Sequence, residues 1–203
     1  MTKEQQPDKW SHDSEKLFEG IKATLAARAI GAQADLTNLG QIDSMELPSG
    51  WVSGKPHVSG EAPEHAATYQ EFHPPGDDDC QLGFYYRGRR VSKLAGETFH
   101  KILKQPEHVL THAEFDLLAE IIGDKINPAD FHTASPRTKL IDGKMVLVVD
   151  GRYKELDHDN SHMYVDSDGT GTAIQEIFFQ APVKKFAKYE QAAHKAMLSI
   201  RWK

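Results

Sequence analysis

The residues best suited to chemistry gather between positions 157 and 168. Carboxylate and imidazole side chains are dense there, and the candidate metal ligands are Asp157, His158, His162, Asp166 and Asp168. Carboxylate oxygens and imidazole nitrogens are donors that divalent metal ions use in proteins. One interpretation is therefore a divalent metal site at this end of a β-hairpin. We expect no cofactor apart from such a metal ion.

The spacing in this stretch follows known metal-binding patterns only in part. Asp166 and Asp168 match part of a calcium-binding loop, but Gln175 stands where the bidentate Glu belongs. His158 and His162 are four residues apart, a spacing that brings two ligands together on a helix. The Asp-Asn-Ser sequence between them predicts a loop instead. Two solvated turns at one end of a sheet are the alternative interpretation.

Other catalytic patterns are not found in the sequence. Cys80 is the single cysteine, so an intrachain disulfide is excluded and a cysteine zinc site cannot form. The acidic residues beside it raise a thiol's pKa and disfavour a catalytic thiolate. There is no glycine-framed nucleophile elbow and no phosphate-binding loop ending in Gly-Lys-Ser/Thr. We therefore predict no catalytic residue.

A basic and aromatic segment is the candidate protein-binding surface. It consists of Tyr85, Tyr86, Arg87, Arg89 and Arg90. Tyrosine and arginine are enriched where proteins bind proteins, so an acidic segment of a partner is the expected ligand. The end of the chain adds basic residues, namely Lys184, Lys185, Lys188, Lys195, Arg201 and Lys203. The alternative is ordinary solvated surface.

The last third of the chain predicts consecutive strands followed by one helix. Apolar or alternating runs cover residues 138–141, 144–149, 152–156, 161–165 and 172–180. Asp142 and Gly143 predict a two-residue hairpin turn, whereas Asp150 and Gly151 predict a bulge or bend. After Pro182 the apolar period changes from two to about 3.6 residues, which predicts a terminal amphipathic helix packed on the sheet.

The front half predicts helices on either side of further strands. An apolar stripe over residues 14–30 predicts a first helix, and residues 69–72 and 81–86 predict a hairpin. Ser92 can cap a helix that must end near Pro106. Thr111 and Glu114 have capping-box spacing, and the apolar stripe after them continues to Gly123.

This order of elements predicts an α+β fold. The expected architecture is a mostly antiparallel sheet packed between helices, an α/β/α sandwich with an N-terminal helix. Residues 1–13 have the composition of a disordered tail, and residues 14–203 form one domain. A chain of 203 residues with 39% apolar residues can bury a core of that size.

Charge and hydropathy narrow the functional class. The formal net charge of −6 argues against general nucleic-acid binding, which normally requires a basic excess. No apolar run approaches the length of a membrane span, and the N-terminal residues have no signal-peptide core. We therefore expect a cytoplasmic protein with no membrane span. The sequence leaves its oligomeric state open.

The layout resembles that of the PsbP-like α/β/α sandwich superfamily. The resemblance covers residues 45–202 and rests on the Leu-Pro-Ser-Gly-Trp entry at 47–51, a middle helical segment, a β-meander, the run Gln-Glu-Ile-Phe-Phe-Gln-Ala-Pro at 175–182 and a closing helix. The superfamily is mostly non-enzymatic and includes photosystem II subunits, nuclear import factors that bind a small GTPase, and bacterial chaperones for secreted effectors. This chain departs from it in its leading helix, its longer middle helical segment and its lack of a targeting peptide.

Two functional classes follow. The resemblance, together with the missing catalytic patterns, implies a non-enzymatic protein-binding module, similar to a chaperone or adaptor. The alternative is a small metal-dependent or small-molecule-binding enzyme that uses the Asp/His-rich hairpin end, residues 157–168. An enzyme requires a concave site with convergent titratable groups, whereas a binding module requires an exposed apolar or aromatic patch.

Overall fold

The computed structural model describes residues 40–55, 57–59 and 67–203, which belong to the compact unit Gln33–Lys203. For residues 57–59, 67 and 87–90 the description covers the backbone alone. The predicted tail at 1–13 and the predicted helix at 14–30 lie outside the described residues.

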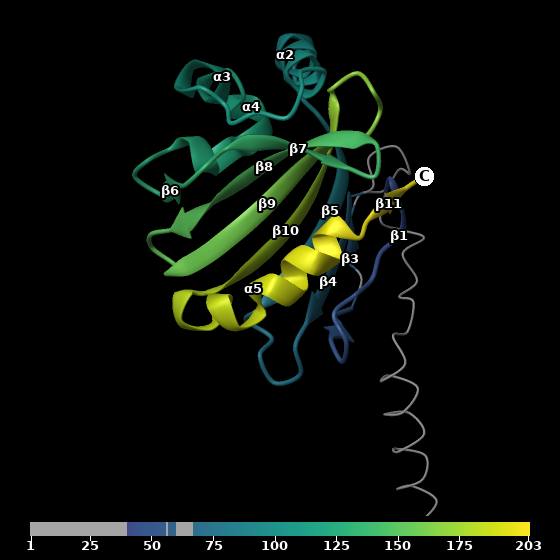
Figure 1. Ribbon diagram of the computed structural model, residues 1–203, viewed down its shortest axis with the longest axis vertical. Helices are drawn as coiled ribbons and strands as arrows, with labels where there is room; N and C mark the ends of the chain where they lie inside the picture. The colour runs from purple at the N-terminus through teal and green to yellow at the C-terminus, as the bar shows by residue number, and fades with distance from the viewer. Residues whose placement is uncertain (1–39, 56, 60–66) are drawn as a thin grey trace, which may run out of the picture. The chain divides into compact units, whose positions relative to one another are not determined.

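The described part of the chain is an α+β structure built on one large antiparallel sheet (Figure 1). Its strand order is β2-β4-β5-β10-β9-β8-β6, with β3 paired to β4 and β7 paired to β8. The strands are β2 Val52–Ser53, β3 His57–Ser59, β4 Ala67–His73, β5 Gln81–Arg90, β6 Phe131–Thr133, β7 Arg137–Ile141, β8 Lys144–Tyr153, β9 His158–Asp166 and β10 Ala173–Pro182. A separate pair joins β1 (Ile42–Ser44) to β11 (Arg201–Trp202).

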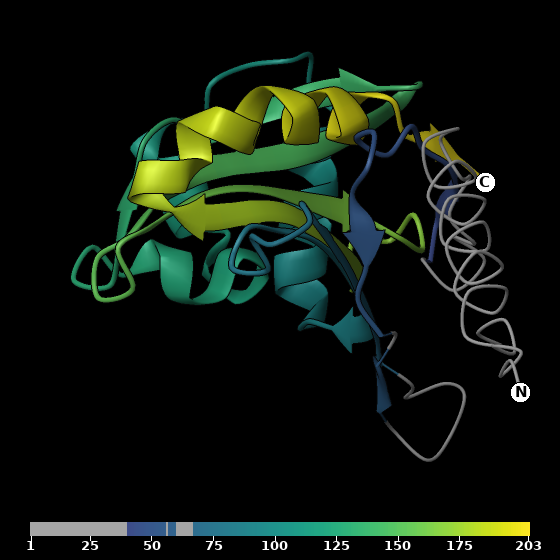
Figure 2. The same cartoon turned by 90° about the horizontal axis from the view of Figure 1, so that it is seen from below.

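Helices cover both faces of the large sheet (Figure 2). The helix α5 (Val183–Leu198) lies on one face; α2 (Lys93–Leu103), α3 (His112–Asp116), α4 (Ala119–Ile122) and the 3₁₀ helix η2 (Gly123–Ile126) lie on the other. Side chains alternate along a strand, so β8 supplies both cores. Val146 and Val148 join the cluster under α5, and Leu147 and Val149 join the cluster under the other helices. This explains why the predicted central strand is an unbroken apolar run.

The helix starts follow the capping signals in the sequence. The Ser92 hydroxyl accepts a hydrogen bond from the Ala95 backbone N–H at 3.3 Å, and Thr111 forms a reciprocal capping box with Glu114. The apolar stripe after Thr111 was predicted to be one continuous helix, and that prediction was wrong. The chain leaves helical geometry at Leu118, whose buried side chain fills the core between α3 and α4.

Two strand boundaries also differ from the prediction. The bend predicted at Asp150 and Gly151 is absent: β8 runs through both residues without a change of register. Position 151 requires glycine, because an added Cβ would lie 2.3 Å from the His132 carbonyl oxygen and 2.4 Å from the Phe131 ring. Likewise the loop predicted between His158 and His162 is strand β9, because its polar residues pair with polar residues of β8.

The β4–β5 turn is tied to the first half of α5. Lys185 Nζ lies 2.8 Å from carboxylate oxygens of both Asp77 and Asp79, and Lys188 Nζ lies 3.2 Å from Asp77. The Tyr189 hydroxyl also donates to Asp77. This acidic turn therefore neutralises two of the lysines that the sequence analysis assigned to a basic surface. Among the described residues, no helix is long and apolar enough to cross a membrane.

Candidate functional site

The structure places the five predicted metal ligands far apart. Asp157 and His158 lie at one end of β9, and Asp166 and Asp168 lie at or beyond its other end. A nine-residue strand separates its ends by about 26 Å at about 3.3 Å per residue. Within the described ranges, no group of three or more His, Cys, Asp or Glu side chains is arranged to hold a metal ion. The five residues do not form one site.

Asp166 and Asp168 instead organise the loop between β9 and β10. Asp166 Oδ1 accepts two backbone N–H groups of this loop, and its Oδ2 lies 3.1 Å from His100 Nδ1 on α2. Burial raises the pKa of Asp168, but hydrogen bonds from Thr170 and Thr172 outweigh burial and lower that pKa to about 2. These carboxylates are engaged in the protein's own hydrogen bonds.

His162 points into the core under α2–α4, away from the other candidate ligands. Its ring is stacked between Tyr164 and Phe178, with ring centroids 4.4 and 5.1 Å away. His162 Nε2 lies 3.1 Å from Glu176 Oε2. Burial, assisted by the nearby Lys125 charge, lowers the pKa of His162 to about 4. The imidazole is therefore neutral near pH 7, and Nε2 is the nitrogen that carries the proton.

Lys125, which the sequence analysis did not single out, completes this buried polar cluster. Its ammonium lies 5.4 to 5.8 Å from the centroids of Phe131, Tyr153 and Tyr164, and 3.7 Å from Asp124. Burial lowers the pKa of Lys125, and nearby carboxylates oppose the shift. A lysine at helical spacing among the apolar residues at 121, 122 and 126 was the available sequence signal.

The two tyrosines of the predicted basic and aromatic surface lie on different faces of the sheet. Tyr85 and Tyr86 are neighbours in β5, so their side chains point to opposite faces of the sheet. The Tyr85 ring meets that of Tyr69 at 6.4 Å on the α2–α4 face, whereas Tyr86 packs over Gly40 on the α5 face. The backbone of Arg87, Arg89 and Arg90 continues β5 through a register shift, and their side chains lie outside the described part.

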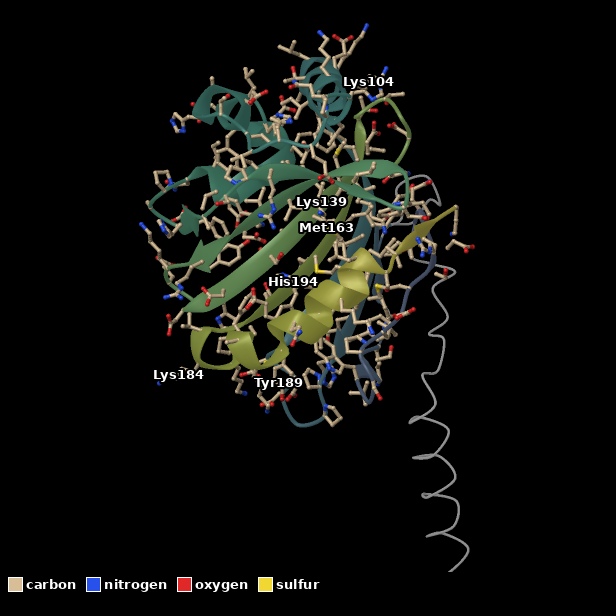
Figure 3. The ribbon with its side chains drawn as sticks, in the orientation of Figure 1. Lys104, Lys139, Met163, Lys184, Tyr189 and His194 are labelled. Atoms are coloured by element: carbon tan, nitrogen blue, oxygen red, sulfur yellow. The ribbon has the colours of Figure 1, made fainter. Side chains whose placement is uncertain are left out.

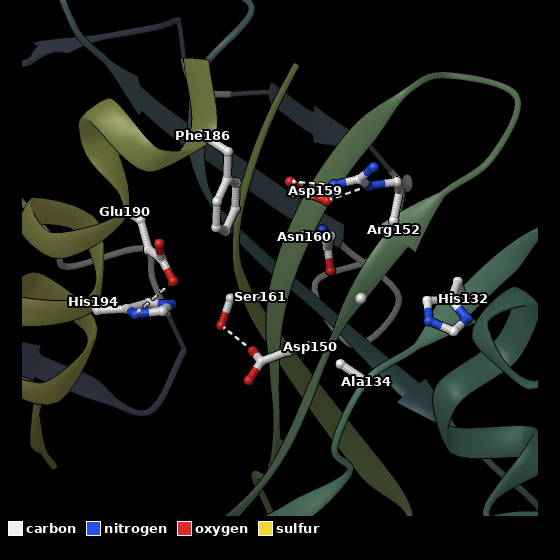
Figure 4. A pocket seen from close by; sticks show the side chains of 11 residues that line it. His132, Ala134, Asp150, Arg152, Asp159, Asn160, Ser161, Phe186, Glu190 and His194 are labelled. Carbon is white, nitrogen blue, oxygen red and sulfur yellow. Dashed lines mark hydrogen bonds and ion pairs between the residues drawn. The ribbon is translucent and has the colours of Figure 1, made fainter. Parts of the chain in front are cut away.

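A hollow of about 500 Å³ opens between α5 and the ends of three strands (Figure 4). We call it the α5 pocket. Phe186, Glu190 and His194 project from α5 on one side, and Asp150 and Ser161 face them from β8 and β9. The remaining lining residues are His132, Ala134, Gly151, Arg152, Asp159 and Asn160. Figure 3 labels His194, which lies in the C-terminal half of α5.

Two carboxylates at the wall of the α5 pocket are paired with arginines. Ser161 donates its hydroxyl proton to Asp150 Oδ1 at 2.6 Å, and Arg137 donates to Asp150 Oδ2 at 2.6 Å. Arg152 donates two hydrogen bonds to Asp159, at 2.7 and 3.1 Å. These pairs fix the strand ends and leave the carboxylates with further acceptor capacity.

Two further groups at the α5 pocket, Glu190 and His194, have acceptor atoms that are not hydrogen-bonded within the described part of the chain. Glu190 Oε1 lies 3.9 Å from His194 Nδ1, too far for a hydrogen bond but close enough to favour a proton on that nitrogen. Within the described residues, His194 Nε2 is buried without a hydrogen-bond partner. Buried polar atoms normally have partners, so this atom marks a site with unused hydrogen-bonding capacity.

A second hollow continues from the α5 pocket along the same helix. It shares Glu190 and His194 with the pocket, and its lining runs along α5 from Ala187 to Leu198. We call the two hollows together the α5 groove. The exposed Leu198 side chain adds apolar surface at its far end.

The α5 pocket was not predicted from the sequence. Asp150 was assigned to a bend and Ser161 to the start of a strand after a loop, so their shared position on the α5 face was missed. The available signal was polar residues at alternate positions, 150 and 152 on one strand and 159 and 161 on the next.

The fold and the pocket define the class of this protein as an α+β protein with a polar hollow beside its terminal helix. No protein-family model matches the chain, and no curated protein matches its sequence.

Proposed function

We propose that this chain is a non-enzymatic protein-binding module, similar to a chaperone or adaptor, that acts in the cytoplasm. We further propose that its architecture is the PsbP-like α/β/α sandwich, with an N-terminal helix before the described residues. The α5 groove is its binding surface in this proposal. The observation that carries it is the groove itself, where polar side chains from α5, β8 and β9 converge on unused acceptor atoms.

The shape of the α5 groove favours an extended segment of another protein. The groove follows α5 from Phe186 to Leu198, which is about 18 Å at 1.5 Å rise per residue. An extended chain of five or six residues spans about that length. Apolar surface at both ends and polar groups in the middle fit a segment of mixed character.

The hydrogen bonds of the α5 pocket favour binding over catalysis. A serine nucleophile is commonly activated by a histidine base, whereas the Ser161 hydroxyl donates to the carboxylate of Asp150. Asp150 is itself held in an ion pair by Arg137. The pocket wall is thus arranged to hold charges in place.

A small polar molecule is the second candidate ligand. The α5 pocket, at about 500 Å³, falls in the range of about 300 to 1,000 Å³ that is usual for small-molecule sites. This volume is the observation that favours it. In that case the site is the α5 pocket, which includes Asp159, Asn160 and Ser161 of the segment 157–168 but none of the five predicted metal ligands.

A photo-crosslinking experiment tests the proposal in the organism's own cells. A benzoylphenylalanine residue replaces Ala187 in the α5 groove, and a matched variant carries it at the exposed Ala113 of α3, on the opposite face of the sheet. We expect one protein to be crosslinked from position 187 and not from position 113. Failure to crosslink any protein from position 187 would overturn the proposal. If native mass spectrometry then found a small molecule bound to the chain, the second candidate would replace it.

A further inference from the structure

We infer that the α5 pocket binds a basic side chain of the partner protein, a lysine ammonium or an arginine guanidinium. This inference rests on the proposed function and specifies the chemistry of the same site. It is drawn from the kinds of hydrogen-bonding atoms that face the pocket and from the charges around it.

The α5 pocket is lined by several side chains that carry hydrogen-bond acceptors, namely Asp150, Ser161, Glu190 and His194. Arg152 and His132 also line it, but the Arg152 guanidinium is engaged by Asp159. An ionised carboxylate only accepts hydrogen bonds, which applies to Glu190 and to the remaining capacity of Asp150. With the proton on Nδ1, Nε2 of His194 is an acceptor, and it has no hydrogen-bond partner among the described residues. Ser161 uses its proton on Asp150 and keeps its oxygen lone pairs. A ligand that satisfies these atoms must be rich in donors, as ammonium and guanidinium groups are.

The charges around the α5 pocket also favour a cationic ligand. Asp150, Asp159 and Glu190 contribute three negative charges, whereas Arg137 and Arg152 contribute two positive charges to the ion pairs of this wall. The local balance is therefore one negative charge while the histidines are neutral. Glu190 is the carboxylate of this set without an arginine partner among the described residues, and its side chain is 44% exposed. A cation beside it gains a charge-assisted hydrogen bond.

The apolar part of the pocket suits the stem of a long basic side chain. Phe186 forms one wall and is itself held by Phe179, with ring centroids 5.1 Å apart. Lysine and arginine carry three or four methylene groups that pack on apolar surface while the charged end reaches polar atoms. An acidic side chain would instead place a second negative charge beside that of Glu190.

Nuclear magnetic resonance of the full chain at pH 8, where an ordinary histidine is neutral, tests this inference. The probes are the N-acetyl methylamides of lysine and arginine, and the controls are those of norleucine and glutamate. We expect the two cationic probes to shift the His194 Nε2 nitrogen resonance and the backbone amides around Ser161. The norleucine and glutamate controls should leave both unchanged. This comparison requires no variant.

Charge removal provides the second measurement. We expect Glu190→Gln to weaken binding of the lysine probe about tenfold or more, because a hydrogen bond to a charged group is lost. The matched control Glu97→Gln removes the same charge from α2, on the other face of the sheet, and should leave binding unchanged. Equal effects of the two variants, or binding of the glutamate or norleucine probe as tight as that of lysine, would overturn the inference.

The two proposals fail in different ways. If a protein is crosslinked from position 187 with equal yield in the Glu190→Gln variant, the binding module stands and the basic side chain is refuted. If the lysine probe binds and no protein is crosslinked, the pocket is an amine site for a free ligand, and both the protein partner and its basic side chain are refuted.

Discussion

Replacing His162 should remove a defined part of the pH dependence of stability. Its imidazole is fully buried between Tyr164 and Phe178, and burial lowers its pKa from 6.5 to about 4. In the unfolded chain the same group keeps its ordinary pKa. Between these two values the unfolded state binds a proton that the folded state does not bind, so acid stabilises the unfolded state.

The size of the effect follows from the width of this pH window. Each pH unit changes the free energy of unfolding by up to about 1.4 kcal/mol for one proton. The proton taken up by His162 on unfolding should therefore lower the free energy of unfolding by about 3 kcal/mol between pH 6.5 and pH 4. Full stability is present above pH 6.5 and declines as the pH falls. Below about pH 4 the folded imidazole also titrates, and the decline from this residue ends.

Urea unfolding at half-unit steps from pH 7.5 to pH 4, followed by tryptophan fluorescence, measures this decline. His162→Gln keeps an N–H donor for Glu176 and has no imidazole to titrate, so its stability should fall by about 3 kcal/mol less than that of the natural protein over this window. His112→Gln is the matched control, because the His112 side chain is 92% exposed, and it should show the natural pH dependence. Identical pH profiles for His162→Gln and the natural protein would refute the reasoning, whatever their absolute stabilities.

Two further tests concern close packing and thiol chemistry. In thermal unfolding, Gly171→Ala should destabilise the fold by at least about 1 kcal/mol more than Gly169→Ala. Both glycines have positive φ angles, so both substitutions carry backbone strain. Only the Cβ at 171 would meet the Gly96 carbonyl oxygen, at 2.1 Å, whereas the space at 169 is open. Burial, with Asp79 nearby, raises the pKa of Cys80 to about 11, so about one thousandth of the thiol is ionised at pH 8. Reaction of Cys80 with a disulfide reagent should therefore be slow until urea unfolds the chain. Rapid reaction in the native state would contradict the burial of this thiol.

Local signals were sufficient for most elements of the second half of the chain. Asp142 and Gly143 adopt φ angles of 46° and 79°, as a two-residue hairpin turn between β7 and β8 requires. The change of apolar period after Pro182 correctly placed α5, because helix and strand periods differ within a few residues. Ser92 capped the helix that it was expected to cap. Each of these features depends on neighbours in the sequence.

The features that were mispredicted depend on partners distant in the sequence. Asp150 stays in a strand because Ser161 and Arg137 hydrogen-bond to it from the strands on either side. The stretch from His158 to Ser161 reads as a loop by composition, yet its pairing with β8 makes it strand. Turn propensity is a weak preference that tertiary contacts can override, and here the ladder of β8 and β9 does so.

The α5 pocket could not be predicted from local patterns for the same reason. Its acceptors come from strands β8 and β9 and from a helix more than 20 residues later in the chain. The candidate metal ligands are close together in the sequence, but the extended strand β9 separates those at its two ends in space. Proximity in sequence was thus a poor guide on a strand, where nine residues span most of the sheet.

The polarity of the α5 face changes along the strands, and this change has a physical consequence. Under the middle of α5, residues such as Val148 and Met163 are apolar and buried, whereas at the pocket end the next positions on the same face are Asp150 and Ser161. Burying polar groups is unfavourable unless they are hydrogen-bonded, and here the fold satisfies Asp150 yet leaves His194 Nε2 without a partner in the described region. Apolar residues at these positions would stabilise the core more. A donor-rich ligand supplies the missing partner, so its binding should also stabilise the folded protein.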